Sequence, residues 1–400
     1  MASQLSVLTV LSRVGQGPYK GGYNEGGAMP KLAGKAIPLA ERIDGLTSEG
    51  DLYERLEDNK VRCYACGHRC LILEGQRGIC QVRFNRDGVL MVPHNYVGAL
   101  QCDPTEKKPF FHVLPGSNAL TVGMLGCDYH CSYCQNWLTS QALRDPGAGL
   151  EPEELSAERL VAMAQQLGAA VIASSYNEPL ITSEWALEVF KLAKPRGLIT
   201  AYVSNGNGTR EALEYLRPWL DCYKIDLKSM SDKSYRSLGG TLENVLETVR
   251  MVHEMGFWME IVTLLIPGFN DSDEEIREAA RFLAGVSPDV PWHLTAFHPD
   301  YKMTGPENTG PRTLLRAAEI GREEGLRFVY CGNLPGRVGD CENTVCPSCR
   351  KPLVRRYGYN ILEYALTTEG TCRGCATPVP GIWSVSRPEP ISSSASDTAI

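Results

Sequence analysis

Three cysteines with C-x3-C-x2-C spacing, Cys127, Cys131 and Cys134, follow directly after a short apolar run. The run, residues 119–125, predicts a buried strand, and Gly126 marks a turn into the cysteine loop. Three thiolates on one loop can ligate three irons of a [4Fe–4S] cube and leave the fourth iron open to a small molecule. The alternative is a buried helical stripe, because positions i, i+4 and i+7 share one helix face. The polar residues between the cysteines favour the loop.

A second cysteine group precedes this loop. Its four members, with C-x2-C-x3-C spacing and one further cysteine, are Cys63, Cys66, Cys70 and Cys80. Four thiolates fit either tetrahedral zinc or an iron–sulfur cluster, and His68 is an alternative ligand. We favour a structural zinc knuckle and keep an auxiliary cluster open.

A third group lies near the C-terminus, where two C-x2-C pairs are separated by 22 residues. Its members are Cys346, Cys349, Cys372 and Cys375. This spacing is typical of a zinc ribbon, with ribbon strands expected over residues 353–359. An auxiliary iron–sulfur cluster is the alternative. Basic residues in this segment are a weak hint of nucleic acid, but aromatic platforms and base-reading motifs are missing, so we do not expect nucleic-acid binding.

The composition excludes several classes of partner. A net charge of −7 gives no overall attraction to nucleic acid or to an anionic membrane, and no apolar run has the roughly 20 residues of a membrane span. Fifteen cysteines, an odd number gathered in closely spaced groups, favour metal binding in a reducing cytoplasm over disulfides.

The chain is long enough for more than one domain. We expect a flexible N-terminal extension, a Cys-rich metal-binding segment, a β/α barrel, a zinc-ribbon-like segment and a disordered tail, over residues 1–50, 51–115, 116–335, 336–385 and 386–400.

Strand and helix patterns alternate through the middle of the chain. After the run before Cys127, strands are expected at 169–174, 198–203, 222–226, 257–265, 293–296 and 327–330, with helices at 183–193, 210–216, 242–254, 274–283 and 313–324. This alternation predicts an α/β fold, a partial TIM-like barrel of about six β/α units. Polar residues follow nearly every strand, and the C-terminal ends of barrel strands are where active sites form.

An ordered series of motifs narrows the interpretation. It comprises Gly-Cys-x3-Cys-x2-Cys-Gln-Asn-Trp at 126–137, Tyr-Asn-Glu-Pro at 176–179, Asp-Leu-Lys at 226–228, Ile-Pro-Gly-Phe-Asn-Asp at 266–271, Trp-His-Leu at 292–294 with Phe-His-Pro-Asp-Tyr-Lys-Met at 297–303, and Cys-Gly-Asn-Leu-Pro-Gly at 331–336. The three-cysteine loop resembles that of the radical S-adenosylmethionine (SAM) superfamily. The whole series, over about residues 52–383, resembles the AmmeMemoRadiSam-system radical SAM enzymes, relatives of the pyruvate formate-lyase activating enzymes.

The resemblance implies roles for matching residues. Cys127, Cys131 and Cys134 would hold a [4Fe–4S] cluster, and Glu178 would receive the SAM amino group. The superfamily has two glycines where this chain has Tyr176 and Asn177. The remaining implied contacts are to the SAM carboxylate or the substrate from Asn205, Asp226 and Lys228, to the ribose from His298, and to the adenine from Tyr133 and the backbone of 266–268.

The implied reaction is reductive cleavage of SAM to methionine and a 5′-deoxyadenosyl radical, which abstracts hydrogen from an unidentified substrate. A reductant such as flavodoxin or ferredoxin is implied, as are Memo-like and AMMECR-like protein partners. One alternative is an activating enzyme for a glycyl-radical enzyme. Another is a non-catalytic multi-zinc binding module, which would be colourless and independent of SAM.

Overall fold

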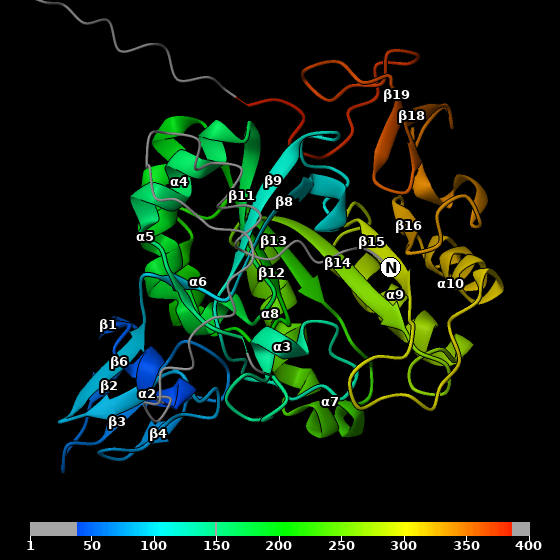
Figure 1. Ribbon diagram of the computed structural model, residues 1–400. Coiled ribbons are helices and arrows are strands. Elements are labelled where there is room, and N and C mark those ends of the chain that lie inside the picture. Colours follow the sequence, from blue (N-terminus) through cyan, green and yellow to red (C-terminus); the bar gives the residue numbers. More distant parts are fainter. Residues whose placement is uncertain (1–37, 149, 386–400) are drawn as a thin grey trace, which may run out of the picture.

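The computed structural model describes residues 38–148 and 150–385, and an eight-stranded sheet lies at its centre (Figure 1). The strand order is β16-β15-β14-β13-β12-β11-β9-β8. Seven strands run parallel, and only β8 pairs antiparallel, with β9. The bounds are β8 Ala99–Pro104, β9 Asn118–Gly123, β11 Ala169–Ser174, β12 Ile199–Ser204, β13 Cys222–Asp226, β14 Trp258–Leu265, β15 Trp292–Ala296 and β16 Val329–Gly332.

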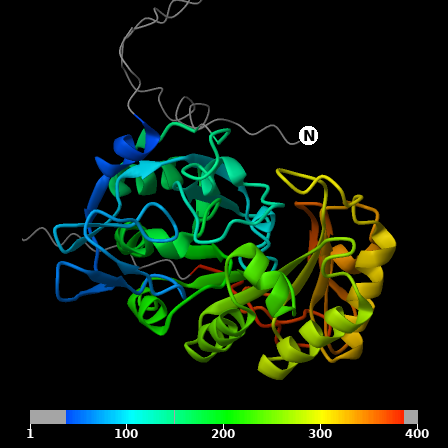
Figure 2. The ribbon, with the colours of Figure 1, turned by 90° about the horizontal axis from the view of Figure 1, so that it is seen from below.

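Helices follow the strands, and most of them cover the outside of the curved sheet (Figure 2). They are α3 Trp137–Ser140, α4 Ala157–Gln166, α5 Ser183–Ala193, α6 Arg210–Leu216, α7 Asp232–Leu238, α8 Leu242–Glu254, α9 Asp273–Val286 and α10 Pro311–Glu323, with short 3-10 turns η1 Thr105–Lys107, η2 Pro179–Thr182 and η3 Lys194–Arg196. Side-chain caps fix several starts: Ser156, Thr209 and Ser272 each accept a backbone N–H from the first turn. The edge strands β8 and β16 do not pair with each other, so the barrel is open.

The predicted α/β fold with a parallel sheet is therefore confirmed, with six β/α units before β16. Five predicted elements, 169–174, 183–193, 210–216, 222–226 and 242–254, have the observed bounds, and the strand expected at 327–330 lies two residues later, at Val329–Gly332. No helix in the two described ranges is long and apolar enough to cross a membrane.

Two small antiparallel sheets form the N-terminal Cys-rich segment, drawn in blue in Figure 1. Their orders are β1-β6-β5 and β2-β3-β4, with β1 Thr47–Glu49, β2 Tyr53–Arg55, β3 Val61–Cys63, β4 Leu71–Ile72, β5 Phe84–Arg86 and β6 Val89–Pro93. A further pair joins β7 Tyr96–Val97 to β10 Glu153–Glu154. The expected flexible extension over 1–50 differs from the structure in its last part, where α2 Leu39–Asp44 and β1 are formed, because β1 pairs with β6. The rest of that extension and the expected tail lie outside the described residues.

A buried ion pair attaches this segment to the barrel. Arg83 and Glu184 form two hydrogen bonds of 2.7 Å, and their side chains are 1% and 7% exposed. Arg83 also donates to the carbonyl of Ile181. Because Glu184 lies in the first turn of α5, the pair fixes the Cys-rich segment against the second β/α unit.

The C-terminal segment is a three-stranded sheet beside β16, drawn in orange and red in Figure 1. It comprises β17 Thr344–Val345, β18 Pro352–Tyr357 and β19 Asn360–Tyr364, preceded by the turn η4 Gly339–Glu342. Arg356 of β18 is buried, donates to the carbonyl of Phe111 and lies 4.2 Å from the centre of that ring. His112 and Leu114 exchange backbone hydrogen bonds with Ile382, so the ribbon packs on the segment that leads into β9.

Candidate functional site

The cysteine loop begins at Gly126, in a backbone conformation that requires glycine. Its φ is +90°, and a Cβ there would lie 2.6 Å from Cγ1 of Val82 and 3.0 Å from the carbonyl oxygen of Cys80. The loop is therefore pressed against the N-terminal Cys-rich segment as it leaves β9.

The three thiols of the loop are enclosed by protein. Burial, together with the Asp128 carboxylate, raises the pKa of Cys127 well above its ordinary value. Burial raises the pKa of Cys131 to about 12 and raises that of Cys134, whose Sγ lies 3.2 Å from the hydroxyl of Ser140. The shifts follow from moving a thiolate out of water, and the Lys228 ammonium opposes them only in part at Cys131 and Cys134.

Asp128, between two of the cysteines, organises the loop. Its carboxylate is fully buried and accepts from the side-chain amides of Asn205, at 2.7 Å, and Asn207, at 2.8 Å. His68 Nε2 lies 3.2 Å from the Asp128 carbonyl oxygen. The loop is thus held from one side by the end of β12 and from the other by the N-terminal knuckle. Asn205, predicted to face SAM or the substrate, directs its amide to the cysteine loop.

The end of β11 has an unusual backbone. Tyr176 adopts φ of +65°, the left-handed conformation that glycine adopts readily and tyrosine rarely does. It is placed there by a close approach: a Cβ on Gly123 would lie 2.7 Å from the Tyr176 Cβ and 2.7 Å from the Ser175 carbonyl oxygen. Tyr176 therefore keeps the backbone form of a glycine while adding an aromatic side chain.

Glu178 follows in the same turn and is 1% exposed. Its carboxylate accepts from the hydroxyl of Ser204 and the backbone N–H of Asn205, each at 2.7 Å, and from the N–H of Leu180 at 3.2 Å. Burial and the Asp128 carboxylate raise the pKa of Glu178 to about 8. Three protein groups therefore donate to this buried carboxylate.

The end of β13 carries a lysine–aspartate–lysine group. Asp226 contacts the ammonium groups of both Lys224 and Lys228, the second at 3.3 Å. Although burial opposes it, these two cations hold the pKa of Asp226 below its usual value. Burial lowers the pKa of Lys224, whereas Asp226 and nearby anionic groups outweigh burial and raise that of Lys228.

A cavity of about 360 Å³ lies inside the open barrel. It brings together part of the cysteine loop, the ends of several strands and the segment before β9. Among the residues that line it are Cys131, Tyr133, Cys134, Tyr176, Lys224, Asp226, Lys228, Lys107, Lys108 and, from the turn between β18 and β19, Tyr359.

The predicted site residues divide into three sets. Tyr133, Asp226 and Lys228 line the cavity together with two of the cysteines. Glu178 and Asn205 are buried behind it, in the network around Asp128. His298 is exposed, and its Nε2 lies 3.1 Å from the Gln135 side-chain nitrogen of the cysteine loop. Tyr133 packs edge-on to Phe269, with ring centres 5.9 Å apart, beside the turn at 266–268.

The sequence reasoning missed Lys108, Lys224 and Tyr176 as cavity residues. Lys224 could have been found from its position two residues before Asp226 on the same strand face. Nothing local in the sequence marks Lys108 as a cavity residue.

Comparison with known proteins gives the family. The pattern described as the radical SAM superfamily matches residues 121–283, which span β9 to α9 and include the cysteine loop. The chain belongs to the radical SAM superfamily. It is 36% identical over 334 residues to an uncharacterized protein of Methanocaldococcus jannaschii, covering 83% of this chain and 98% of that one.

Other radical SAM relatives match less of the chain. A pyruvate formate-lyase-activating enzyme of Clostridium pasteurianum is 27% identical over 176 residues, or 43% of this chain and 72% of that enzyme. A solved radical SAM methyltransferase of Sphaerobacter thermophilus has a TM-score of 0.43 and 17% identity, over 74% of this chain and 80% of that one.

The residues present fit the cluster that this superfamily implies. Of the three thiols of this loop, Cys131 is buried and Cys127 and Cys134 are half-buried, and Cys131 and Cys134 line a cavity that is also lined by cations. Within the described ranges, the sulfur atoms of Cys127, Cys131 and Cys134 do not all lie within 4.8 Å of one another. Three thiols from one loop are the donor set that such a cluster takes when one iron is left open to a small molecule.

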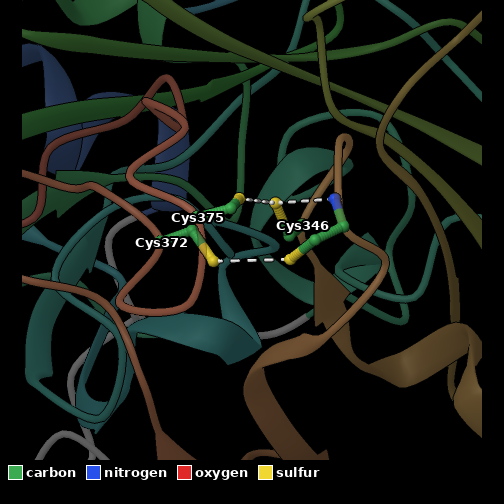
Figure 3. A group of neighbouring side chains, drawn as sticks. Cys346, Cys372 and Cys375 are labelled. Carbon is green, nitrogen blue, oxygen red and sulfur yellow. Dashed lines mark hydrogen bonds between the residues drawn. The ribbon is translucent and has the colours of Figure 1, made fainter.

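The C-terminal cysteines are gathered much more tightly (Figure 3). Sγ of Cys346 lies 3.6 Å from Sγ of Cys375, and Sγ of Cys349 lies 3.7 Å from Sγ of Cys372. All four sulfurs lie within 4.8 Å of one another, so this group could hold a metal ion.

The N-terminal cysteines are less compact. Cys63, Cys66 and Cys80 are buried and Cys70 is half-buried. Burial raises the pKa of Cys66 and brings that of Cys80 to about 12. They do not form a metal-sized group within the described part of the chain, and zinc or a cluster in the knuckle stays a prediction.

Proposed function

We propose that this radical SAM protein uses a [4Fe–4S] cluster to cleave SAM reductively and to abstract hydrogen from a substrate bound in the barrel cavity. The observation that carries the proposal is the meeting of Cys131 and Cys134 with the Asp226–Lys228 pair in one cavity. A multi-zinc binding module without chemistry has no need of buried cations beside its thiols, which cost free energy to desolvate.

The cysteine loop would hold the cluster through Cys127, Cys131 and Cys134. When bound and reduced, the cluster and SAM supply methionine and a 5′-deoxyadenosyl radical, the species that removes a hydrogen atom. Lys228 would orient the SAM carboxylate through a charge-assisted hydrogen bond. Glu178 would receive the SAM amino group.

Tyr133 and the turn at 266–268 would border the adenine, since the Tyr133–Phe269 contact already offers an aromatic edge there. His298 would approach the ribose from the loop after β15. The walls of the cavity would exclude water from the reactive site, which prevents side reactions.

The ordered motif series over about residues 52–383 supports the proposal that the chain is an AmmeMemoRadiSam-type enzyme, alongside Memo-like and AMMECR-like partners. A flavodoxin or ferredoxin would supply the electron that reduces the cluster. The cytoplasmic location of the protein stays a prediction. The alternative, activation of a glycyl-radical enzyme, is favoured by the similarity to pyruvate formate-lyase-activating enzymes.

For the C-terminal ribbon we propose structural zinc. A tetrahedral ion with Zn–S bonds of about 2.3 Å places its sulfurs about 3.8 Å apart. The sulfur separations of 3.6 and 3.7 Å support this choice over an auxiliary cluster.

The central test is anaerobic reconstitution with iron and sulfide, reduction, and measurement of 5′-deoxyadenosine from SAM. The matched variant replaces Cys127, Cys131 and Cys134 with alanine. We expect product from the wild type and none from the variant. A wild type without product, or a variant that forms as much, would refute the proposal.

A further inference from the structure

Lys108 is a buried cation that the implied roles do not use. It is the C-cap of η1, its side chain is 5% exposed, and it lines the barrel cavity. Its ammonium donates to the Tyr176 hydroxyl at 2.8 Å, lies 4.6 Å from the centre of that ring, and is 3.5 Å from a carboxylate oxygen of Asp103. Burial of an ammonium is unfavourable unless anions compensate it.

The compensation within the protein is incomplete. Asp103 is shared, because Lys107 binds the same carboxylate oxygen at 3.0 Å. The same arrangement occurs on β13, where the carboxylate of Asp226 forms ion pairs with both Lys224 and Lys228. Four lysines therefore line this cavity, one aspartate lines it, and the shared Asp103 lies beside Lys108. A cluster on the cysteine loop would bring negative charge to Lys228, which faces Cys131, so the excess of positive charge lies at Lys107 and Lys108.

SAM does not remove this excess. Its single carboxylate can neutralise one lysine, and its ammonium and sulfonium groups add positive charge. A second anion would balance the excess near Lys108, and Lys108 lines the cavity in which such an anion would bind.

The backbone of Tyr176 supports the same conclusion. A tyrosine in the left-handed region is strained, and such strained residues cluster at ligand-binding sites. Here the costly conformation carries the ring and hydroxyl that hold Lys108 at the cavity wall. A structural role alone would be met by glycine at this turn.

We propose that Lys108, positioned by Tyr176 and Asp103, binds an anionic group of the substrate, so that the substrate is a small molecule bearing a carboxylate or a phosphate. This inference rests on the proposed function, because it assigns the substrate class of the same cavity. A glycine in a partner protein, the substrate of an activating enzyme, does not itself supply such an anion.

Two anion probes test the proposal by calorimetry on the reconstituted protein, with and without SAM and at constant ionic strength. Malonate represents carboxylates and pyrophosphate represents phosphates. We expect the wild type to bind at least one probe, Lys108→Met to bind it about tenfold or more weakly, and Lys108→Arg to recover part of the loss. Lys191→Met, on the exposed face of α5, is the matched control and should bind as the wild type does.

The outcomes separate the two claims. No probe binding to the wild type, or equal binding by Lys108→Met and Lys191→Met, overturns the anion site. Anion binding that depends on Lys108 without any formation of 5′-deoxyadenosine upholds the site and refutes the proposed reaction. The stronger probe identifies the carboxylate or the phosphate class.

Discussion

The side-chain amide of Asn205 donates to Oδ1 of Asp128 at 2.7 Å, and the backbone N–H of Asn205 donates to Glu178 at 2.7 Å. One residue at the end of β12 thus joins the cysteine loop to the end of β11. All three residues are less than 10% exposed, so water cannot replace a lost donor.

Replacing Asn205 with alanine should therefore destabilise the loop that would hold the cluster. The change removes one of two amide donors to the buried Asp128 carboxylate, which costs about 1–3 kcal/mol in the free energy of unfolding. We also expect less iron per chain after reconstitution. Urea unfolding and iron analysis measure the two effects, and exposed Asn308→Ala is the control. Unchanged stability and iron content in Asn205→Ala would contradict the assigned role.

Anion binding should weaken as the pH rises through about 8. Burial lowers the pKa of Lys108 from 10.5 to about 8 against the opposing effect of Asp103, so its charged form disappears above that pH. The groups facing it are Cys102, Asp103, Lys107 and Tyr176.

Malonate affinity measured at pH 7 and pH 9 should differ about tenfold in the wild type, because the protonated fraction falls by that factor. Lys108→Arg provides the control, since arginine stays charged over this range. Lys224, whose pKa burial also lowers, is present in both proteins. An equal loss of affinity in both proteins would show that Lys108 is not the group responsible.

Much of the barrel was predictable because its strands and helices have clear periodicity. The three-cysteine loop, the Asp226–Lys228 pair and the C-terminal C-x2-C pairs are local patterns, and the structure places each at the end of a predicted element or in the ribbon. In each of these patterns, the residues that act together lie within a few positions of one another in the sequence, so their spacing alone reveals them.

The contacts between segments distant in sequence could not be predicted in the same way. Lys108 meets Tyr176 across 68 residues, and Arg83 meets Glu184 across 101. The knuckle was expected only to flank the barrel, yet His68 contacts the cysteine loop. Such pairs follow from the packing of whole segments, which no short spacing encodes.

The Arg83–Glu184 pair should be among the costly ion pairs to break. Glu184→Gln leaves a buried guanidinium without its counter-charge, and we expect a loss of about 3–5 kcal/mol in the free energy of unfolding. Glu247→Gln breaks the surface pair with Arg250, whose members are about half exposed, and should cost less than about 1 kcal/mol. Chemical denaturation measures the free energy of unfolding of both variants. Similar losses would show that the buried Arg83–Glu184 pair contributes no more to stability than a surface ion pair.

Loss of one C-terminal cysteine should remove zinc and loosen the ribbon. In Cys349→Ser we expect about one zinc fewer per chain and a lower Tm, because the ion holds β18 and the last cysteine pair together. Metal analysis and thermal unfolding measure this, with Cys102→Ser as the control, since Cys102 lies on β8 outside the group. Equal zinc content in both variants would exclude the ribbon as the zinc site.

Because Gly123 lies so close to Tyr176, we expect a glycine-to-alanine change to lower the free energy of unfolding at Gly123 and to raise it at Gly285. In Gly123→Ala the new methyl would lie 2.7 Å from the Tyr176 Cβ and the Ser175 carbonyl oxygen, so β11 must shift, at a cost of about 1–3 kcal/mol. Gly285→Ala, in the last turn of α9, meets no atom within 4 Å and should gain up to about 1 kcal/mol from helix propensity. The shift at Gly123 should also weaken malonate binding, because it moves the tyrosine that holds Lys108. If Gly123→Ala is as stable as Gly285→Ala and binds malonate normally, then the Tyr176 backbone does not position this side of the cavity.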